Sequence, residues 1–370
     1  MSFINSFRTA AEAKAAFAQD VSEHEARGVI IPGAVSYITD GMKRDFGLAM
    51  DALPTLATTP SAGIPSLLTT YVDPTVYEVV FAPQKAVEVA GERKIGDWTM
   101  QTAMFPTIEH TVEVSTYGDF NNNGHAGVNS NFPQRQAYLF QTVKEYGDLE
   151  LERAGLARIN YASELDRAAA AGLNRFQNLT YFFGVAGIAN YGLLNDPALP
   201  AALTPGVKGN GNGNVWIFNN SPNATANEIF SDVQALVIKL IGQSGGLVDS
   251  ESKMTLGMSP GANAALATTN SFGISVADLI KKNYPNMRIV VAVQYGALSA
   301  TNPQGVAAGN FLQLIADEVE GQETSYCAFN EKLRAHPLFR DLSSYKQKVT
   351  AGTWGAIIRQ PFAVASMVGI

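Results

Sequence analysis

A proline-free stretch from Leu151 to Phe183 constrains the fold most strongly. It is rich in Ala, Leu, Arg and Glu, which favour helix. Its apolar or small residues recur every three or four positions, so they share one face: Leu151, Gly155, Ile159, Ala162, Leu165, Ala169, Leu173, Phe176, Thr180 and Phe183. We expect one continuous helix of about 50 Å at 1.5 Å per residue, with Gly155 and Gly172 as its weak points.

Glycine recurs directly after this stretch, and the helix is expected to end there. Gly184 is a natural C-cap, and Gly187 and Gly192 permit backbone angles that other residues avoid. Asp196-Pro197 then prevents the helix from resuming. A long core helix in any α+β protein would show the same pattern, so the rest of the chain must decide.

The composition favours burial of this chain against other copies or partners. Charged residues make up only 16% of its 370 residues, against about a quarter in typical domains, which leaves few solvated groups to cover a large surface. The net charge of −7 argues against general nucleic-acid affinity. The single Cys327 excludes a disulfide framework or thiolate cluster within one chain.

No targeting or membrane segment is evident. The chain has no apolar run of 18 residues, and the charged N-terminus from Met1 to Gly28 lacks a signal core. Residues 8–27 have the pattern of a short amphipathic helix, and residues 28–74 are interrupted repeatedly by Pro and Gly. So long a stretch without periodicity is unusual inside a compact domain. We therefore expect residues 1–75 to form an arm that lies over a surface of this chain or of a neighbour.

The region from Gly91 to Gly147 predicts a projecting β-hairpin. Asp97–Phe105 and Thr111–Tyr117 have β-type composition with a joint at Pro106, and an Asn/Gly tract follows from Asp119 to Asn131. Ala137–Tyr146 then alternates like a returning strand. A lone hairpin is marginal in water, so its cover is expected to come from another subunit.

The remainder predicts an α/β lobe and two closing strands. Residues 76–90 are expected to be strand, and Ala224–Ile241 a helix capped by Asn223 or Thr225. Further expected strands are Lys253–Met258, Arg288–Gln294, Asn310–Val319, Thr324–Phe329, Tyr345–Ala351 and Phe362–Val368, and further expected helices are Ala262–Thr268 and Val276–Asn283. The last two strands are expected to return beside the long helix.

Catalytic motifs in this sequence are incomplete. Gly257-Met-Ser259-Pro-Gly261 matches a nucleophile elbow between strand and helix. However, the oxyanion hole needs the N–H of the residue after the serine, and Pro260 has none. Ser259 fits better as the N-cap of a helix that starts with Pro260.

Metal and phosphate motifs are equally weak. Asp119-Phe-Asn121-Asn-Asn123 opens like an EF-hand loop, but the position for a bidentate Glu is Ser130. The four histidines lack zinc spacing: they are His24, His110, His125 and His336. Gly209–Gly213 lacks the pattern of a phosphate loop, and Asn178-Leu-Thr180 is a chance glycosylation match inside the helix. The sequence predicts no cofactor, no metal and no enzymatic site.

The order of these features resembles the major capsid proteins of tailed bacteriophages, the Hong Kong 97-type shell fold that encapsulins share. It consists of an arm, a long hairpin, a spine helix ending in Tyr191-Gly-Leu-Leu-Asn-Asp-Pro197, an α/β lobe and a final strand pair. The fold-defining turn Gly192, Leu193, Leu194 and Asn195 and the closing segment Gly352–Val364 carry the resemblance most specifically.

The resemblance implies an α+β fold with the following domains: 1–75 N-terminal arm, 76–90 P-domain strand, 91–147 extended loop, 148–220 P-domain with spine helix, 221–340 A-domain and 341–370 P-domain return strands. It implies that the extended loop lies over the adjacent subunit, with contact residues Trp98, Met100, Phe105 and Tyr117, since aromatics and Met are enriched in interface cores. Each of these four could equally be hairpin core.

The implied function is self-assembly into an icosahedral virion shell, built in the host cytoplasm, that encloses DNA without binding a specific sequence. Scaffolding, portal and decoration proteins are the implied partners. In some members an isopeptide bond between a loop lysine and an asparagine near the C-terminus joins subunits covalently. Lys94 fits the lysine, but no Asn follows Asn330. An encapsulin-like compartment and a hydrolase using Ser259 remain as alternatives.

Overall fold

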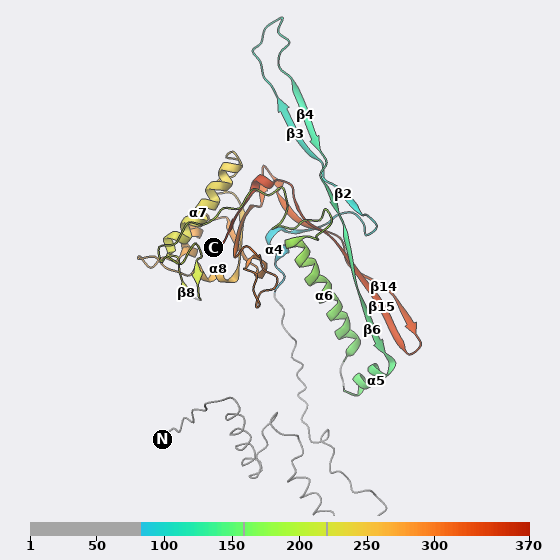
Figure 1. The fold of residues 1–370 in the computed structure, drawn as a ribbon. Coiled ribbons are helices and arrows are strands. Elements are labelled where there is room, and N and C mark those ends of the chain that lie inside the picture. The colour runs from blue at the N-terminus through green and yellow to red at the C-terminus, as the bar shows by residue number, and fades with distance from the viewer. Residues whose placement is uncertain (1–82, 158–159, 220) are drawn as a thin grey trace, which may run out of the picture. The chain divides into compact units, whose positions relative to one another are not determined.

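The computed structural model describes residues 83–370 apart from 158, 159 and 220 (Figure 1). The predicted arm at 1–75 and the first residues of the strand predicted at 76–90 therefore lie outside the described residues. Within the described part, no helix is long and apolar enough to cross a membrane.

One four-stranded sheet has the order β1-β14-β15-β6. Its strands are β1 (Glu92–Lys94), β14 (Ser325–Asp341), β15 (Ser344–Ile358) and β6 (Tyr138–Gly147). β1 runs parallel to β14, and the other pairs are antiparallel. Helix α6 (Tyr161–Phe183) covers one face, where Leu173 packs with Val349 and Ala351 (Figure 1).

A second four-stranded sheet has the order β10-β9-β11-β16. Its strands are β10 (Met287–Val291), β9 (Met254–Met258), β11 (Phe311–Ala316) and β16 (Val364–Val368). Helix α7 (Ala226–Gln243) buries an apolar face beside it, including Ile229, Val233 and Leu236, and α8 (Pro260–Ala265) and α9 (Val276–Asn283) complete this lobe.

The end of α6 joins the two sheets in one core. Phe182 meets Tyr295 edge-on, with ring centroids 5.5 Å apart, and both belong to a buried cluster with Leu193, Phe311 and Ile315.

The remaining elements are short. They are the helices α4 (Ala86–Ala90) and α5 (Asp148–Leu156) and two 3-10 turns (Val293–Tyr295 and Pro361–Ala363). Four strand pairs complete the list: β2 (Thr102–Met104) with β5 (Gln134–Gln136), β3 (Thr107–Val112) with β4 (Ala126–Asn131), β7 (Ile217–Phe218) with β8 (Ser221–Pro222), and β12 (Glu318–Val319) with β13 (Gln322–Glu323).

The prediction of one helix from Leu151 to Phe183 is wrong. α5 ends at Leu156 and α6 begins at Tyr161. Asn160 acts as a new N-cap, because its side chain accepts a hydrogen bond from the backbone N–H of Ser163 at 3.4 Å. A cap residue has non-helical angles, and Gly155 weakens the turn before it, so the chain starts a second helix instead of continuing the first.

The strand predicted at 76–90 is also wrong over its described end, since Ala86–Ala90 form helix α4. Ala86, Val89 and Ala90 are buried, which is helical spacing. The backbone N–H of Ala86 donates to Oδ1 of Asn178 on α6 at 3.1 Å. A partner far along the chain thus satisfies the helix start, which local composition could not reveal.

Most other elements are confirmed with shifted ends. α9 begins and ends as predicted, and Thr225 caps α7 by accepting from the N–H of Glu228. The strand predicted at Thr324–Phe329 is the start of the much longer β14. Of the two closing strands, β15 packs against α6, whereas β16 pairs with β11 in the other sheet, so the expectation for that strand is wrong.

Candidate functional site

The turn Gly192–Asn195 folds back along the end of α6. The N–H of Leu193 donates to Tyr181 O at 2.8 Å, and the N–H of Leu194 donates to Phe182 O at 3.0 Å. Asn195 closes the turn from within: its Oδ1 accepts from Gly192 N at 2.7 Å, and its Nδ2 donates to Phe183 O at 2.5 Å. The last carbonyls of the helix, which have no partner inside it, are therefore satisfied.

Gly192 is required here by close backbone approach. A Cβ at this position would lie 2.2 Å from the carbonyl carbon and oxygen of Phe182. Real Cβ contacts are not that short, so no other residue fits without displacing the turn. The fully buried Leu193 follows directly and fills the shared core.

This turn and the two residues before it connect both sheets. Gln313 on β11 donates from Nε2 to Leu193 O at 2.6 Å, and Ala356 on β15 donates from its N–H to Tyr191 O at 2.8 Å. Asn190 donates from Nδ2 to the carbonyl oxygens of Gln136 and Thr353. The sequence identified this turn but missed the role of Asn190, whose partners lie 54 and 163 residues away.

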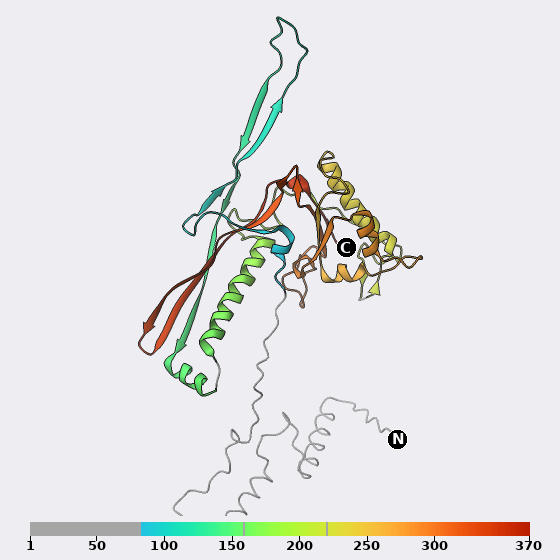
Figure 2. The ribbon, with the colours of Figure 1, turned by 180° about the vertical axis from the view of Figure 1, so that it is seen from behind.

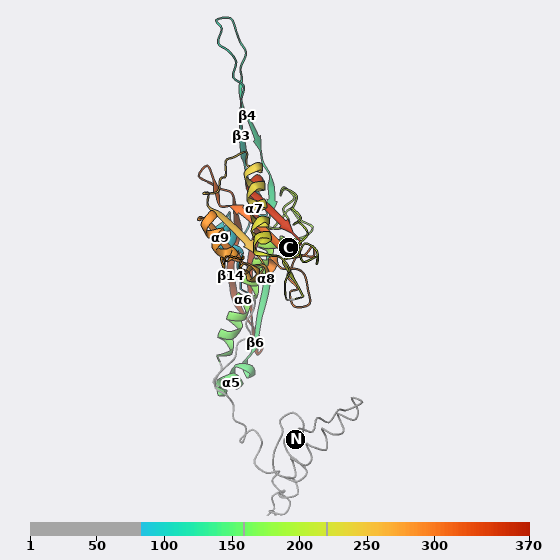
Figure 3. The same cartoon turned by 90° about the vertical axis from the view of Figure 1, so that its left-hand side faces the viewer.

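A two-stranded ribbon, β3 and β4, projects beyond the first sheet (Figures 1 and 2). The two strands pair with each other in register from Thr107–Asn131 to Val112–Ala126. Every residue of both strands is exposed. The side view shows the ribbon standing clear of the helices (Figure 3). A projecting hairpin is confirmed, with Pro106 between β2 and β3, but the strands expected to form it are wrong. β3 ends at Val112, its partner β4 lies inside the tract Asp119–Asn131, and the strand expected to return, Ala137–Tyr146, falls in β6, which pairs with β15.

The four predicted contact residues do not form one cluster. Trp98 meets His336 at 5.9 Å between ring centroids, and Arg334 lies 4.8 Å from the Trp98 ring centroid. Phe105 packs against the buried cluster around Trp354. Met100 is half-exposed, and Tyr117 is 93% exposed near the ribbon tip, where its hydroxyl donates to Asp119 at 2.9 Å. Trp98 and Phe105 thus also have packing roles within the chain, while Met100 and Tyr117 face solvent.

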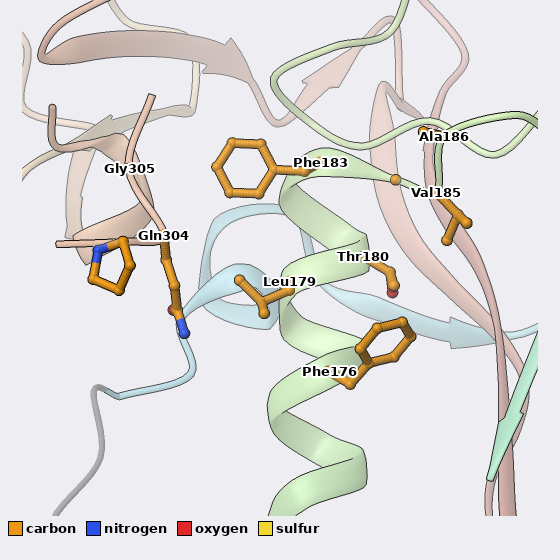
Figure 4. Close-up of a pocket in the computed structure, with 10 residues that line it drawn as sticks. Phe176, Leu179, Thr180, Phe183, Val185, Ala186, Gln304 and Gly305 are labelled. Atoms are coloured by element: carbon orange, nitrogen blue, oxygen red, sulfur yellow. The ribbon is translucent and has the colours of Figure 1, made fainter. Parts of the chain in front are cut away.

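An open apolar hollow of about 420 Å³ lies beside the end of α6 (Figure 4). Phe176, Leu179 and Phe183 line it from the helix, and Gln304 and Gly305 face them from a loop. Its lining contains no titratable side chain. The hollow therefore supplies no acid–base chemistry.

The motifs weighed for catalysis have structural roles. Ser259 caps α8 by accepting from the N–H of Ala262 at 3.1 Å, as its position before Pro260 predicted. Burial raises the pKa of the Cys327 thiol, which keeps it protonated and unreactive. Among the described residues, no group of three or more His, Cys, Asp or Glu side chains could hold a metal ion. Lys94, the lysine that fits the covalent link between subunits, forms an ion pair within the chain, with its Nζ 3.6 Å from Oε2 of Glu331.

Sequence reasoning missed a buried polar cluster that anchors the Gly209–Gly213 loop. Lys208 Nζ lies 2.5 Å from Asp232 Oδ2, and the indole N–H of Trp216 donates to the same oxygen at 2.7 Å. All three residues are buried. This cluster could not be predicted, because its members are separated in the sequence and a lone lysine before a glycine-rich loop is ordinarily solvated.

Comparison with known proteins places this architecture in one family. The sequence matches the family described as the Pa193 gp26 major capsid protein over residues 55–369. No curated protein shows significant similarity. Solved structures share the fold at low identity: the capsid of Myoviridae phage XM1 is 14% identical, with 83% of this chain and 99% of that chain covered and a TM-score of 0.65.

Two further solved structures show the same likeness. The capsid of the native GTA particle is 11% identical, with 84% of this chain and 99% of that chain covered and a TM-score of 0.56. The Mycobacterium phage Ogopogo structure is 10% identical, with coverage of 82% and 98% and a TM-score of 0.52. The fold is the α+β Hong Kong 97-type capsid fold, and the protein is a structural shell subunit. Because the family match spans most of the sequence, this chain belongs to the Pa193 gp26 major capsid protein family.

Proposed function

We propose that this subunit holds its shell together by laying the ribbon (β3 and β4) over an adjacent copy. The observation that carries this proposal is the complete exposure of both strands. A two-stranded ribbon with no third strand and no helix against it is marginally stable in water. Its apolar side chains therefore need cover, and in a shell the neighbouring copy supplies it.

The two sheets support a division of the subunit into a P-domain and an A-domain. The sheet β1-β14-β15-β6 with α6 corresponds to the P-domain, and the sheet β10-β9-β11-β16 with α7, α8 and α9 corresponds to the A-domain. Because β14 begins at Ser325 and pairs throughout with β15, we place the end of the A-domain segment near Thr324 rather than at 340. β16 then returns to the A-domain sheet through its pairing with β11.

The contact residues proposed for the adjacent copy are Met100 and Tyr117, with Trp98 and Phe105 supporting the base of the ribbon. The exposed pair has little cover within the chain, as interface residues do before assembly. The net charge of −7 suits a container that should not adsorb packaged DNA strongly. Scaffolding, portal and decoration proteins are further partners, and assembly takes place in the host cytoplasm.

A ribbon deletion tests the proposal. Thr107 and Asn131 pair directly, so replacing residues 108–130 by Asn-Gly leaves a two-residue hairpin turn in place of the ribbon. We expect this variant to stay soluble and folded by circular dichroism but to give no particles in negative-stain micrographs, while the intact chain gives closed shells. Closed particles from the deletion variant would refute the role of the ribbon.

The alternatives have weaker support. An encapsulin-like compartment would use the same fold, but the matching family is that of a phage major capsid protein. A hydrolase using Ser259 conflicts with its buried position and its engaged side chain. We expect an active-site phosphonate not to label the native protein. Labelling that Ser259→Ala abolishes would support the hydrolase hypothesis instead.

A further inference from the structure

The Gly209–Gly213 loop contains two copies of one tripeptide. Gly209-Asn210-Gly211 and Gly211-Asn212-Gly213 have the same sequence, and both asparagines are exposed. Neither asparagine side chain forms a hydrogen bond with the residues that the structure describes. A β-carbon added at Gly211 or at Gly213 would meet nothing within 4 Å. Local sequence, exposure and space therefore do not distinguish the two Asn-Gly pairs.

An Asn-Gly pair is prone to spontaneous deamidation, because glycine has no side chain to shield its backbone nitrogen. This nitrogen attacks Cγ of the asparagine: a bond forms between the nitrogen and Cγ, the Cγ–Nδ2 bond breaks, and ammonia leaves with the proton of the glycine N–H. Water then opens the cyclic imide at either of its carbonyl carbons, which gives aspartate or isoaspartate. The reaction needs a glycine nitrogen that is free to lose its proton and to approach Cγ.

The backbone hydrogen bonds do distinguish the two pairs. The N–H of Gly211, the nitrogen that follows Asn210, donates to Lys208 O at 3.0 Å. The N–H of Gly213, the nitrogen that follows Asn212, donates no hydrogen bond within the described part of the chain. The reaction at Asn210 must therefore first break a hydrogen bond of the folded loop, whereas the reaction at Asn212 need not.

The acceptor of this protecting hydrogen bond is anchored on α7. Lys208 is buried, with its Nζ 2.5 Å from Oδ2 of Asp232. The N–H of Gly209 donates to Oε1 of Glu228 at 2.7 Å. The N–H of Lys208 donates to Gly213 O at 2.9 Å. The turn that begins at Lys208 is thus fixed from the interior, and Gly213 is held through its oxygen, which leaves its nitrogen free.

A third Asn-Gly pair, Asn123-Gly124, lies near the tip of the ribbon and is restrained in another way. The N–H of Asn123 donates to Oδ1 of Asn121 at 3.2 Å, and its carbonyl oxygen accepts from Oγ of Ser115 at 2.6 Å. A β-carbon at Gly124 would lie 3.2 Å from a neighbouring backbone oxygen. The backbone rotation that ring closure needs is therefore hindered at this pair.

From these observations we infer that Asn212 is a site of spontaneous deamidation, and that the folded loop selects it over the identical tripeptide at Asn210. The reaction needs only water and the chain itself. The inference concerns a single subunit and does not depend on the role of the ribbon.

The product changes the charge and the length of the loop. Residues 209–238 contain Glu228 and Asp232 but no Lys or Arg, so the new carboxylate finds no compensating cation in this segment. An aged subunit therefore carries one more negative charge than the net −7 of the sequence. Isoaspartate also adds a methylene group to the main chain, directly before the residue whose oxygen accepts from Lys208.

Peptide mass spectrometry tests the selection in the full chain, incubated at mildly alkaline pH either folded or in urea. In the folded protein we expect Asn212 to lose its amide about fivefold faster than Asn210, the ratio that corresponds to one hydrogen bond of about 1 kcal/mol. In urea the two should react at equal rates, because their neighbours are the same. An intact Asn212, a faster Asn210, or the same ratio in folded and unfolded protein would overturn the inference.

Matched variants locate the added charge. Asn210→Gln and Asn212→Gln each replace one asparagine by a longer side chain that closes the ring less readily. Anion exchange of aged, folded protein should show the acidic form in the unchanged chain and in Asn210→Gln, but not in Asn212→Gln. Asp232→Asn weakens the anchor of Lys208, so it should speed the reaction at Asn210 and leave Asn212 unchanged. Persistence of the acidic form in Asn212→Gln, or an unchanged rate at Asn210 in Asp232→Asn, would contradict the assignment.

Discussion

Replacing Gly192 by alanine should destabilise the subunit through one backbone contact. The added Cβ would lie 2.2 Å from the carbonyl group of Phe182 and 2.4 Å from the nitrogen of Phe183. Both contacts are with backbone at the end of α6, which cannot rotate away as a side chain can. To remove this steric overlap, the turn Gly192–Asn195 must move away from the helix by roughly 1 Å, since ordinary carbon contacts begin near 3.5 Å.

The loss of stability can be estimated from the contacts that this movement weakens. Three hydrogen bonds, from the N–H groups of Gly192, Leu193 and Leu194, hold the turn, and each contributes about 1 kcal/mol. Leu193 is fully buried, and partial exposure of such a side chain costs up to about 3 kcal/mol. We expect Gly192→Ala to lower the free energy of unfolding by about 3–6 kcal/mol, a large share of the roughly 5–15 kcal/mol typical of a folded domain.

Urea unfolding of unassembled protein, followed by tryptophan fluorescence, measures this loss. With a slope of about 1–3 kcal/mol per molar urea, the midpoint should fall by at least about 1 M. Gly172→Ala is the matched control: it lies inside α6, and a Cβ there meets nothing within 4 Å outside the helix backbone. It should instead raise stability by roughly 0.5–1 kcal/mol. An unchanged midpoint for Gly192→Ala would refute the close-approach argument.

Three further outcomes are expected. Asp232→Ala should destabilise the lobe that contains α7 by about 3–5 kcal/mol in urea titrations, because it leaves the buried ammonium of Lys208 without its carboxylate; Asp232→Asn, which keeps an acceptor, should cost less. A hydrogen bond from the backbone N–H of the α7 N-cap residue lowers the pKa of Glu228, so its ionised form adds stability above its unfolded pKa, near 4.5, and this is lost as the pH falls through the lower folded value. Glu228→Gln should therefore flatten the dependence of stability on pH below about 5, and a slope equal to that of the unchanged chain would contradict the assignment. Burial raises the pKa of Cys327, so a thiol reagent should react only after urea unfolding; rapid reaction of the native protein would show that the site opens.

The candidate site was partly accessible to sequence reasoning. Recurrent glycine predicted that the helix would end there, and the resemblance to capsid proteins singled out Gly192–Asn195. The close approach to Phe182 that requires Gly192 could not be predicted from the sequence. That a hairpin projects could be predicted from β composition, but its pairing could not, because β4 lies in the Asn/Gly tract from Asp119 to Asn131. The separation of Trp98 and Tyr117 could not, because Trp98 packs against His336 and Arg334, residues of a strand more than 200 positions away.

What the sequence determined by itself is local: the ends of α9, the Ser259 cap of α8 and the alternation of β6, whereas it left the cap of α7 open between Asn223 and Thr225. Each depends on residues within a few positions of one another, so periodicity and capping are sufficient. The tertiary structure alone decided that 86–90 are helix, that β14 continues to Asp341, and that β16 joins the second sheet. In these cases the deciding partner, such as Asn178 or the paired strands β15 and β11, lies far along the chain, and long-range pairing overrides local preference.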